Sequence, residues 1–150
     1  MRPVPGDDPD ASPPTFLRLL VVEDEMSTLF AIREFFALPQ HEVDCATDPI
    51  EALRLLDAHP YDVIITDLNL TPSRSGEGLL VASYARKRNP RACVIMLTAY
   101  GTEATRDEAL RCGVDVYQTK PVELAQLTAH LSRVLQRDSD ADRRGAGDAV

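Results

Sequence analysis

Polar side chains follow four apolar runs of this chain, and their types suit the chemistry of metals and phosphate. Glu23 and Asp24 follow LRLLVV, Asp67 follows VIIT, Thr98 follows ACVIML and Lys120 follows DVYQT. Carboxylate oxygens are the ligands that Mg²⁺ prefers, and a hydroxyl and an ammonium can stabilise the oxygens of a phosphoryl group in transfer. The set indicates a site for metal-assisted phosphoryl chemistry, provided that the fold brings these residues together.

The elements that must position them are short strands that alternate with helices. Five apolar runs have the length of buried strands: 16–22, 43–46, 62–66, 92–97 and 114–118. Between them, apolar residues recur at helical spacing, as at Leu29, Ile32 and Phe36 in the first expected helix. Further helices are expected around the sets Ile50, Leu53, Leu56 and Leu79, Leu80, Tyr84, and over 105–112 and 122–136. Strict alternation predicts an α/β fold, a three-layer α/β/α sandwich around a parallel sheet in the order 2-1-3-4-5.

Such a sheet would bring the polar residues to one edge. In this order the first and third strands are neighbours, so Glu23, Asp24 and Asp67 would crowd together at the switch point. Two carboxylates about 4 Å apart repel by roughly 4 kcal/mol at an effective dielectric near 20, which calls for a divalent cation or an ammonium. We assign Asp24 and Asp67 as direct ligands of Mg²⁺ and Glu23 as a ligand through water.

Each of these residues has a simpler explanation when it is taken alone. An acidic pair after a strand is as readily a solvated helix cap, and the same holds for Asp67. Thr98 is an ordinary residue for the end of a strand. Lys120 is harder to explain without an anion, since a strand-end Lys before Pro121 gains nothing from burial. It is their convergence at one edge that favours a site.

Length and composition limit the organisation and the class of the protein. With 150 residues and 44% apolar content, we expect one domain over 16–137, a Pro-rich disordered tail over 1–15 and a second over 138–150. A net charge of −8 disfavours direct nucleic-acid binding. No apolar run approaches the ~18 residues that span a bilayer, so we expect a cytoplasmic protein without membrane contact. The three cysteines lack the spacing of a disulfide framework or zinc site.

The spacing of these residues resembles the receiver domain of bacterial two-component response regulators, here of a single-domain type. That family has an acidic pair after strand one, a phosphorylated aspartate after strand three, Thr or Ser after strand four, and an aromatic residue three positions before a Lys-Pro pair. The corresponding residues are Glu23-Asp24, Asp67, Thr98, Tyr117 and Lys120-Pro121. The resemblance covers nearly all of 16–137 and implies the flavodoxin-like order of strands.

The resemblance also implies a mechanism and a set of partners. Asp67 would take a phosphoryl group from a histidine kinase or a histidine phosphotransfer protein, assisted by Mg²⁺, Lys120 and Thr98. Thr98 would then move inward and Tyr117 would reorient, which would change the surface of the fourth helix, fifth strand and fifth helix, where a downstream effector protein docks. The Lys120-Pro121 bond would be cis. We expect a monomer that can dimerise on phosphorylation and a signalling domain rather than an enzyme.

Some positions depart from the usual pattern of that family. Glu23 stands where Asp is more common, and the loop after Asp67, TPSRSGEG, is about one residue longer than usual, with an Arg74 that we expect to be exposed. By the resemblance, the backbone carbonyl of Asn69 would be a further Mg²⁺ ligand. The side chains of Asn69 and Tyr100 would tune the rate of dephosphorylation.

Other classes remain possible for the same residues. The string DLNLT from Asp67 resembles the nucleophile motif of haloacid dehalogenase-type phosphatases, but Asn69 stands where that motif has an acid, and no cap domain is evident. A receiver-like module that docks without phosphorylation would not need Asp67, Thr98 and Lys120 together. A flavin-binding domain is weaker still, because EDEMST follows the first strand in place of a phosphate-binding loop.

Overall fold

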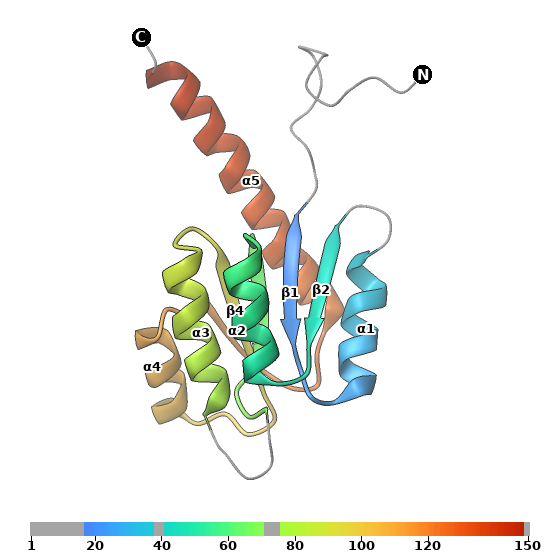
Figure 1. Cartoon of the computed structure of the whole chain (residues 1–150). Coiled ribbons are helices and arrows are strands. Elements are labelled where there is room, and N and C mark those ends of the chain that lie inside the picture. The colour runs from blue at the N-terminus through green and yellow to red at the C-terminus, as the bar shows by residue number, and fades with distance from the viewer. Residues whose placement is uncertain (1–16, 38–40, 71–75, 149–150) are drawn as a thin grey trace.

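The structure is a computed structural model that describes residues 17–37, 41–70 and 76–148, with side chains as far as Arg137. In these ranges strands and helices alternate along the chain (Figure 1). In chain order they are β1 (Arg18–Val22), α1 (Met26–Ala37), β2 (Glu42–Ala46), α2 (Pro49–Ala58), β3 (Val63–Asp67), α3 (Glu77–Arg88), β4 (Cys93–Thr98), α4 (Glu103–Arg111), β5 (Val116–Thr119) and α5 (Leu124–Asp148).

The strands form one parallel sheet in the order β2-β1-β3-β4-β5, which confirms the predicted topology. The register aligns the ends of the central strands: Val22 pairs with Thr66, and Asp67 pairs with Leu97. Because the strands all run the same way, the residues that follow them meet at one edge, the lower edge in Figure 1. We call this the C-terminal edge of the sheet.

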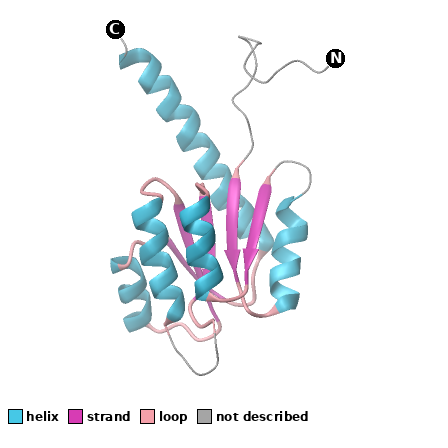
Figure 2. Cartoon of the chain, viewed as in Figure 1, coloured by secondary structure: helices cyan, strands magenta, loops and turns pink. Residues whose placement is uncertain are grey.

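Helices cover both faces of the sheet and give the three layers seen in Figure 2. On one face, α2, α3 and α4 pack against Leu20, Ile64 and Val94. On the other, α1 and α5 pack against Leu19, Ile65 and Ile95, with buried residues Leu29, Ile32, Phe36, Leu127, Leu131 and Val134. Strands β3 and β4 are buried along their whole length, as expected for a parallel sheet that is covered on both sides.

The second and third helices do not bury all the apolar residues whose spacing predicted them. Ile50 and Leu80 are 72% and 57% exposed, although both belong to the apolar sets on which these helices were expected. In α3, the buried residues are small: Gly78, Val81, Ala82 and Ala85. Small side chains let α3 lie closer to the sheet than a leucine face would permit.

The termini of the helices follow local sequence signals. Asp48 caps α2 by accepting a hydrogen bond from the N–H of Glu51, with Pro49 in the first turn. Gly113 follows α4 with a φ of 100°, a conformation that favours glycine.

The last helix is longer than we predicted. We expected it to end at 136 and a tail to begin at 138, whereas α5 continues to Asp148. Adding residues to a helix that tertiary packing already holds avoids the cost of nucleation, so the helix can extend through a segment that contains Gly, Asp and Ser beside Ala and Arg.

Candidate functional site

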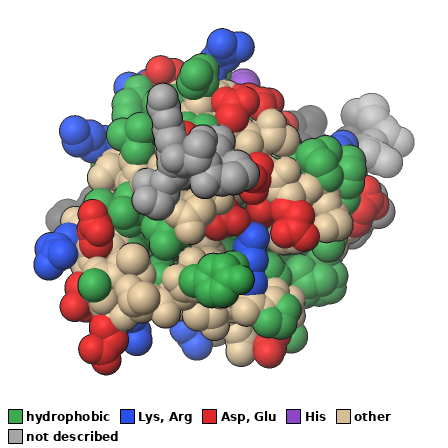
Figure 3. All heavy atoms as spheres, turned by 90° about the horizontal axis from the view of Figure 1, so that it is seen from below, with side chains coloured by type: hydrophobic (Ala, Val, Ile, Leu, Met, Phe, Trp, Pro, Cys, Tyr) green, Lys and Arg blue, Asp and Glu red, His purple; other side chains and the backbone are tan. Residues whose placement is uncertain are grey.

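The residues that we predicted from the ends of β1 and β3 lie together at the C-terminal edge. Glu23, Asp24 and Asp67 each offer a carboxylate oxygen, and these oxygens lie within 4.8 Å of one another. Figure 3 views this edge and shows acidic side chains gathered around a basic side chain in the middle of the face. The ends of β4 and β5 contribute Thr98 and Lys120 to the same region. The predicted convergence is present in the structure.

Asp67 is held at the end of β3 with both carboxylate oxygens engaged. It is only 7% exposed. Its Oδ1 accepts a hydrogen bond from the N–H of Asn69 at 3.1 Å, and its Oδ2 accepts one from Nζ of Lys120 at 2.8 Å. These two bonds fix the orientation of the Asp67 carboxylate at the edge of the sheet.

Lys120 joins two buried carboxylates across the sheet. Its Nζ lies 2.8 Å from Oδ2 of Asp67 and 2.9 Å from Oε2 of Glu23. Its backbone N–H donates to the carbonyl of Thr98, and its bond to Pro121 is cis, as the resemblance implied. Burial by itself lowers the pKa of Lys120, but the bonds to Asp67 and Glu23 outweigh burial and raise it. The ammonium therefore stays charged at neutral pH.

Glu23 is the most deeply buried acid of the site, at 1% exposed. Its Oε1 accepts a hydrogen bond from the N–H of Glu25, and its Oε2 accepts the bond from Lys120. Burial raises the pKa of Glu23 to about 7, although the bond from Lys120 acts in the opposite direction. Asp24, by contrast, is exposed. The two members of the acidic pair therefore have different environments.

The charges of the site do not balance. Three carboxylates lie together, and the ammonium of Lys120 bonds two of them. The donor set consists of hard oxygens close enough to share one ion, so these residues fit Mg²⁺. Of the acidic pair, Glu23 is almost fully buried with both oxygens accepting hydrogen bonds, whereas Asp24 is exposed, so Asp24 is the more accessible ligand.

The two expected switch residues belong to neighbouring strands, Thr98 to the end of β4 and Tyr117 to β5. Thr98 is fully buried, and its Oγ1 accepts a hydrogen bond from the N–H of Tyr100 at 3.3 Å. Tyr117 is half-buried, and its hydroxyl lies 2.8 Å from Oγ1 of Thr105 in α4. Tyr100 itself is 86% exposed. The structure thus connects the expected switch residues to the start of α4.

The loop that follows Asp67 is described only in part. Asn69 is exposed, and its side-chain oxygen accepts a hydrogen bond from the N–H of Gly76, which fixes the two ends of the loop relative to each other. Residues 71–75 lie outside the described residues, and the expectations for the longer loop and for an exposed Arg74 fall there.

A cleft of about 550 Å³ opens next to the site, between α1 and the connection from β5 to α5. Lys120 and Glu25 line it on the side of the acidic cluster, and Ala31, Ile32 and Leu124 supply apolar surface. A partly apolar groove therefore borders the site on the side of Lys120.

Gly78 is a positioning residue that we did not predict. A Cβ at this position would lie 1.9 Å from the carbonyl oxygen of Asp67, and the N–H of Gly78 donates to the carbonyl of Leu68. The start of α3 therefore packs directly on the end of β3 that carries Asp67. A glycine shortly after a strand end was the available signal, but sequence alone does not reveal which backbone approaches it.

The comparison with known families is decisive for the classification. Residues 19–132 match the model of the response regulator receiver domain. The chain belongs to this family. Among curated relatives, the regulatory protein AtoC of Escherichia coli (strain K12) is 36% identical over 123 residues, covering 81% of this chain and 26% of that protein. This chain thus spans about a quarter of that relative.

Solved receiver structures are similar in fold. The receiver domain of the Francisella response regulator 1452 is 29% identical with a TM-score of 0.70, and the match covers 81% of this chain and 98% of that one. A Burkholderia pseudomallei response regulator, solved with a phosphorylated aspartic acid, a calcium ion and citrate, is 25% identical with a TM-score of 0.70, and the match covers 83% of this chain and 72% of that one.

Over the described ranges, no helix combines the length and the apolar character needed to cross a bilayer.

Proposed function

We propose that this receiver domain accepts a phosphoryl group on Asp67 from the phosphohistidine of a histidine kinase or a histidine phosphotransfer protein. The observation that carries the proposal is the position of the Asp67 carboxylate, which ends a central strand beside Glu23 and Asp24 and lies 2.8 Å from Nζ of Lys120. The phosphorylated aspartic acid of the Burkholderia pseudomallei regulator supports the proposal as a property of a similar protein.

The chemistry is an in-line displacement at phosphorus. An oxygen of Asp67 forms a P–O bond as the P–N bond to the donor imidazole breaks, and the imidazole nitrogen keeps the electron pair and takes up a proton. The carboxylate is the nucleophile, so the protein needs no general base. Lys120 and the hydroxyl of Thr98 would donate to the phosphoryl oxygens, which makes positioning and electrostatics the main contributions of the chain.

Asp24 and Asp67 would hold Mg²⁺ directly, with the backbone carbonyl of Asn69, while Glu23 would act through water. When bound, Mg²⁺ would neutralise the charge that spreads over the phosphoryl oxygens. The bonds that Lys120 already makes to Asp67 and Glu23 offset part of the repulsion between the carboxylates. The chain therefore supplies one cation of its own and leaves an excess of negative charge for a divalent ion.

Phosphorylation would then be read by another protein. The new charge of about −1.5 to −2 at Asp67 attracts the hydroxyl of Thr98, and Tyr117 reorients with it. The surface built by α4, β5 and α5 changes, and a downstream effector protein docks there. In this account the chain signals by contact and is not an enzyme in its own right. Its cytoplasmic location and its state as a monomer or phosphorylation-dependent dimer stay predictions.

Asn69 and Tyr100 would set the lifetime of the phosphorylated state. They lie two residues beyond Asp67 and Thr98, and both are exposed at the edge where water must approach. We expect Tyr100→Ala to change the rate of dephosphorylation, which decay of the phosphorylated protein after removal of the donor measures directly. An unchanged decay would contradict a role for Tyr100.

The other functions considered from the sequence are not favoured. A docking module that works without phosphorylation has no need for the bonded group of Asp67, Glu23 and Lys120 at the end of the sheet. The haloacid dehalogenase-type phosphatase requires a second acid where Asn69 stands, and the family match is to the receiver domain instead.

The proposal is tested by intact-mass analysis after incubation with acetyl phosphate and Mg²⁺. The parent protein should gain one phosphoryl group, and Asp67→Asn, which keeps the volume but lacks the nucleophile, should gain none. Asp44→Asn, in the middle of the edge strand β2, is the matched control and should react like the parent. A folded parent that stays unmodified while another receiver domain reacts in parallel would contradict the proposal, as would an equal adduct on Asp67→Asn.

A further inference from the structure

Thr105, in the first turn of α4, joins the cap of this helix to the side chain of Tyr117. Thr102 and Thr105 form a capping box: the N–H of Thr105 donates to Oγ1 of Thr102 at 3.1 Å, and the N–H of Thr102 donates to Oγ1 of Thr105 at 3.0 Å. Oγ1 of Thr105 also lies 2.8 Å from the hydroxyl of Tyr117 and 3.0 Å from the carbonyl of Thr102.

The hydrogen-bond capacity of this hydroxyl determines the direction of the bond to Tyr117. A threonine hydroxyl has one proton to donate and two lone pairs to accept. The proton of Thr105 goes to the carbonyl of Thr102, and one lone pair accepts from the N–H of Thr102. The hydroxyls of Tyr117 and Thr102 both lie within hydrogen-bond distance of the remaining lone pair, at 2.8 and 3.0 Å. Tyr117 therefore contacts the cap of α4 as a hydrogen-bond donor to Thr105.

The ring of Tyr117 is also fitted against the backbone on its other side. A Cβ at Gly101 would lie 3.1 Å from Cε1 and 3.2 Å from the hydroxyl oxygen of Tyr117, which is closer than an ordinary contact. Glycine at 101 therefore gives the ring its place over the β4–α4 connection. The hydroxyl of Thr105 thus bonds the Tyr117 hydroxyl, and the absence of a side chain at Gly101 leaves room for the same ring.

We propose that Thr105 is a positioning residue of the switch, holding Tyr117 over Gly101 while Asp67 is a carboxylate bonded to Lys120. This inference rests on the proposed function, in which Tyr117 reorients when Asp67 is phosphorylated. Reorientation must break the bond to Thr105 and remove one partner from the capping box. The same bond thus stabilises the resting arrangement and links the start of α4 to the phosphorylation site.

The size of the effect follows from the bond that is lost. A partly exposed neutral hydrogen bond shifts an equilibrium by about threefold to tenfold. A residue that stabilises only the resting arrangement lowers, by that same factor, the affinity for every ligand that favours the reoriented arrangement. Removing the hydroxyl of Thr105 should therefore tighten the binding of a phosphoryl mimic to Asp67.

The test is the affinity for beryllofluoride in the presence of Mg²⁺, titrated by NMR of the backbone amides. We expect Thr105→Val to bind about threefold to tenfold more tightly than the parent, and Thr105→Ser, which restores the hydroxyl, to return to the parent value. Gly101→Ala, which crowds the ring from the other side, should also tighten binding. In a Tyr117→Phe background, Thr105→Val should cause no further change.

Thr102→Ala is the matched control, because it removes the Oγ1 that accepts from the N–H of Thr105 and contacts its hydroxyl, and so weakens the cap of α4, while the contact between Thr105 and Tyr117 is kept. Its affinity for beryllofluoride should stay within about twofold of the parent, although it unfolds more easily. Equal affinity of Thr105→Val and the parent would overturn the inference while leaving the proposed function intact. A parent that binds no beryllofluoride would overturn the proposed function together with the inference that rests on it.

A second measurement tests the contact without any phosphoryl mimic. A double-mutant cycle of Thr105→Val and Tyr117→Phe, followed by denaturant unfolding, should show that the second change costs less once the first has been made. Strictly additive effects would overturn the inference even where the titration cannot be completed.

Discussion

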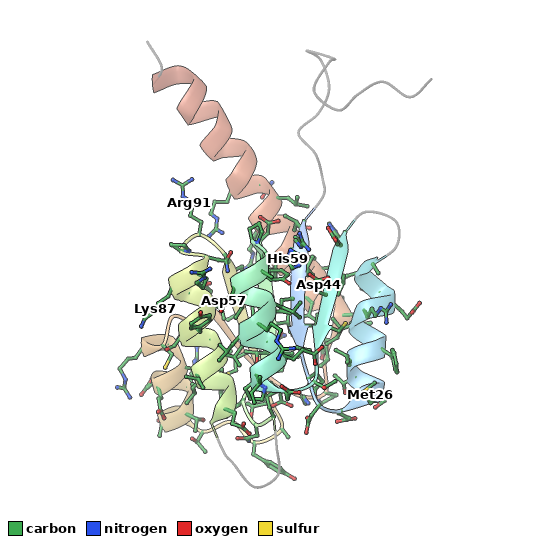
Figure 4. All side chains as sticks on the ribbon, viewed as in Figure 1. Met26, Asp44, Asp57, His59, Lys87 and Arg91 are labelled. Carbon is green, nitrogen blue, oxygen red and sulfur yellow. The ribbon has the colours of Figure 1, made fainter. Side chains whose placement is uncertain are left out.

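At the C-terminal edge of the sheet, Lys120 forms ion pairs with two almost fully buried acids, Glu23 and Asp67. Farther back along the sheet, Arg18 forms ion pairs with two partly exposed acids, Glu42 and Asp44. In Figure 4, Asp44 lies in the upper half of the domain and Met26, just after the acidic pair, lies at the lower edge. Both regions have one cation among several acids.

The difference lies in how the carboxylates are satisfied. Asp44 accepts a hydrogen bond from the hydroxyl of Tyr61 at 2.7 Å, and the ring of Tyr61 lies beneath the guanidinium of Arg18. Asp62 accepts from the backbone N–H of Arg18. Neutral donors and solvent thus satisfy the carboxylates of the Arg18 network. The proposed phosphoacceptor site therefore differs from the Arg18 network in the burial of its excess charge rather than in the number of its charged residues.

The largest contrast is expected when the cation of each region is removed. Lys120→Met leaves Glu23 and Asp67 buried without their partner, so the free energy of unfolding at pH 8 in EDTA should fall by about 3 kcal/mol. Arg18→Met, its matched control, should cost about 1 kcal/mol, because its partners can turn to solvent. Urea unfolding of both variants measures the difference, and equal losses would remove the distinction between the regions.

A smaller difference is expected between two glycines. Gly78→Ala forces a Cβ against the backbone of Asp67, so we expect a loss of about 2 to 3 kcal/mol in the free energy of unfolding. Gly113→Ala, at the other end of the sheet, has a positive φ and would bring a Cβ to 2.8 Å from Cγ of Arg86, which is a side-chain atom rather than backbone, so we expect a smaller loss of about 1 to 2 kcal/mol. Thermal and urea unfolding give both values. A harmless Gly78→Ala would contradict the close packing of α3 on the site.

The pH dependence of stability should come from Glu23, at the C-terminal edge of the sheet. The pKa of Glu23 is raised to about 7 in the folded protein from an ordinary value of 4.5, so the folded state binds this proton more tightly than the unfolded chain. The resulting stabilisation is complete below pH 4.5 and is lost as pH rises through 7. Without Mg²⁺, we expect a loss of about 2 kcal/mol between pH 5 and 8.

Glu23→Gln is the control for this effect, since it keeps the shape of the side chain and removes its titration. Urea unfolding at a series of pH values should show a flatter profile for the variant over pH 5 to 8. Identical slopes for the variant and the parent would show that another group is responsible.

The smallest effect is expected in the Arg18 network. Tyr61→Phe removes the hydroxyl that donates to Asp44 and leaves the ring under Arg18, so the free energy of unfolding should fall by about 1 kcal/mol. Phosphorylation by acetyl phosphate should be unchanged. A variant with the stability of the parent but altered phosphorylation would mean that the two regions are coupled, which the comparison does not allow.

Much of this arrangement was predictable from the sequence. Short apolar runs followed by acids, a hydroxyl and a lysine predicted the strands and the meeting of Glu23, Asp67 and Lys120, because parallel strands bring their ends to one edge. The resemblance to receiver domains implied the order of the strands. The assignments of Mg²⁺ and of phosphorylation stay predictions, since they concern ligands and chemistry rather than the arrangement of residues.

Other features depend on packing that no local pattern encodes. The burial of Glu23, deeper than that of Asp24 beside it, depends on where Lys120 arrives from 97 residues away. The need for Gly78 depends on the approach of the Asp67 backbone, and the buried face of α3 follows its small residues rather than Leu80. The bond between Thr105 and Tyr117 joins two elements whose relative position is set by the whole sheet.

The most direct test of the account is to locate the phosphoryl group by fragmenting the protein after reaction with acetyl phosphate, with Mg²⁺ and in EDTA. We predict a single modified residue, Asp67, and no modification in EDTA. Phosphoryl transfer to any other residue, or equal modification of Asp67 without a divalent cation, would contradict the claim that the buried excess charge at this edge forms a metal-assisted phosphoacceptor site.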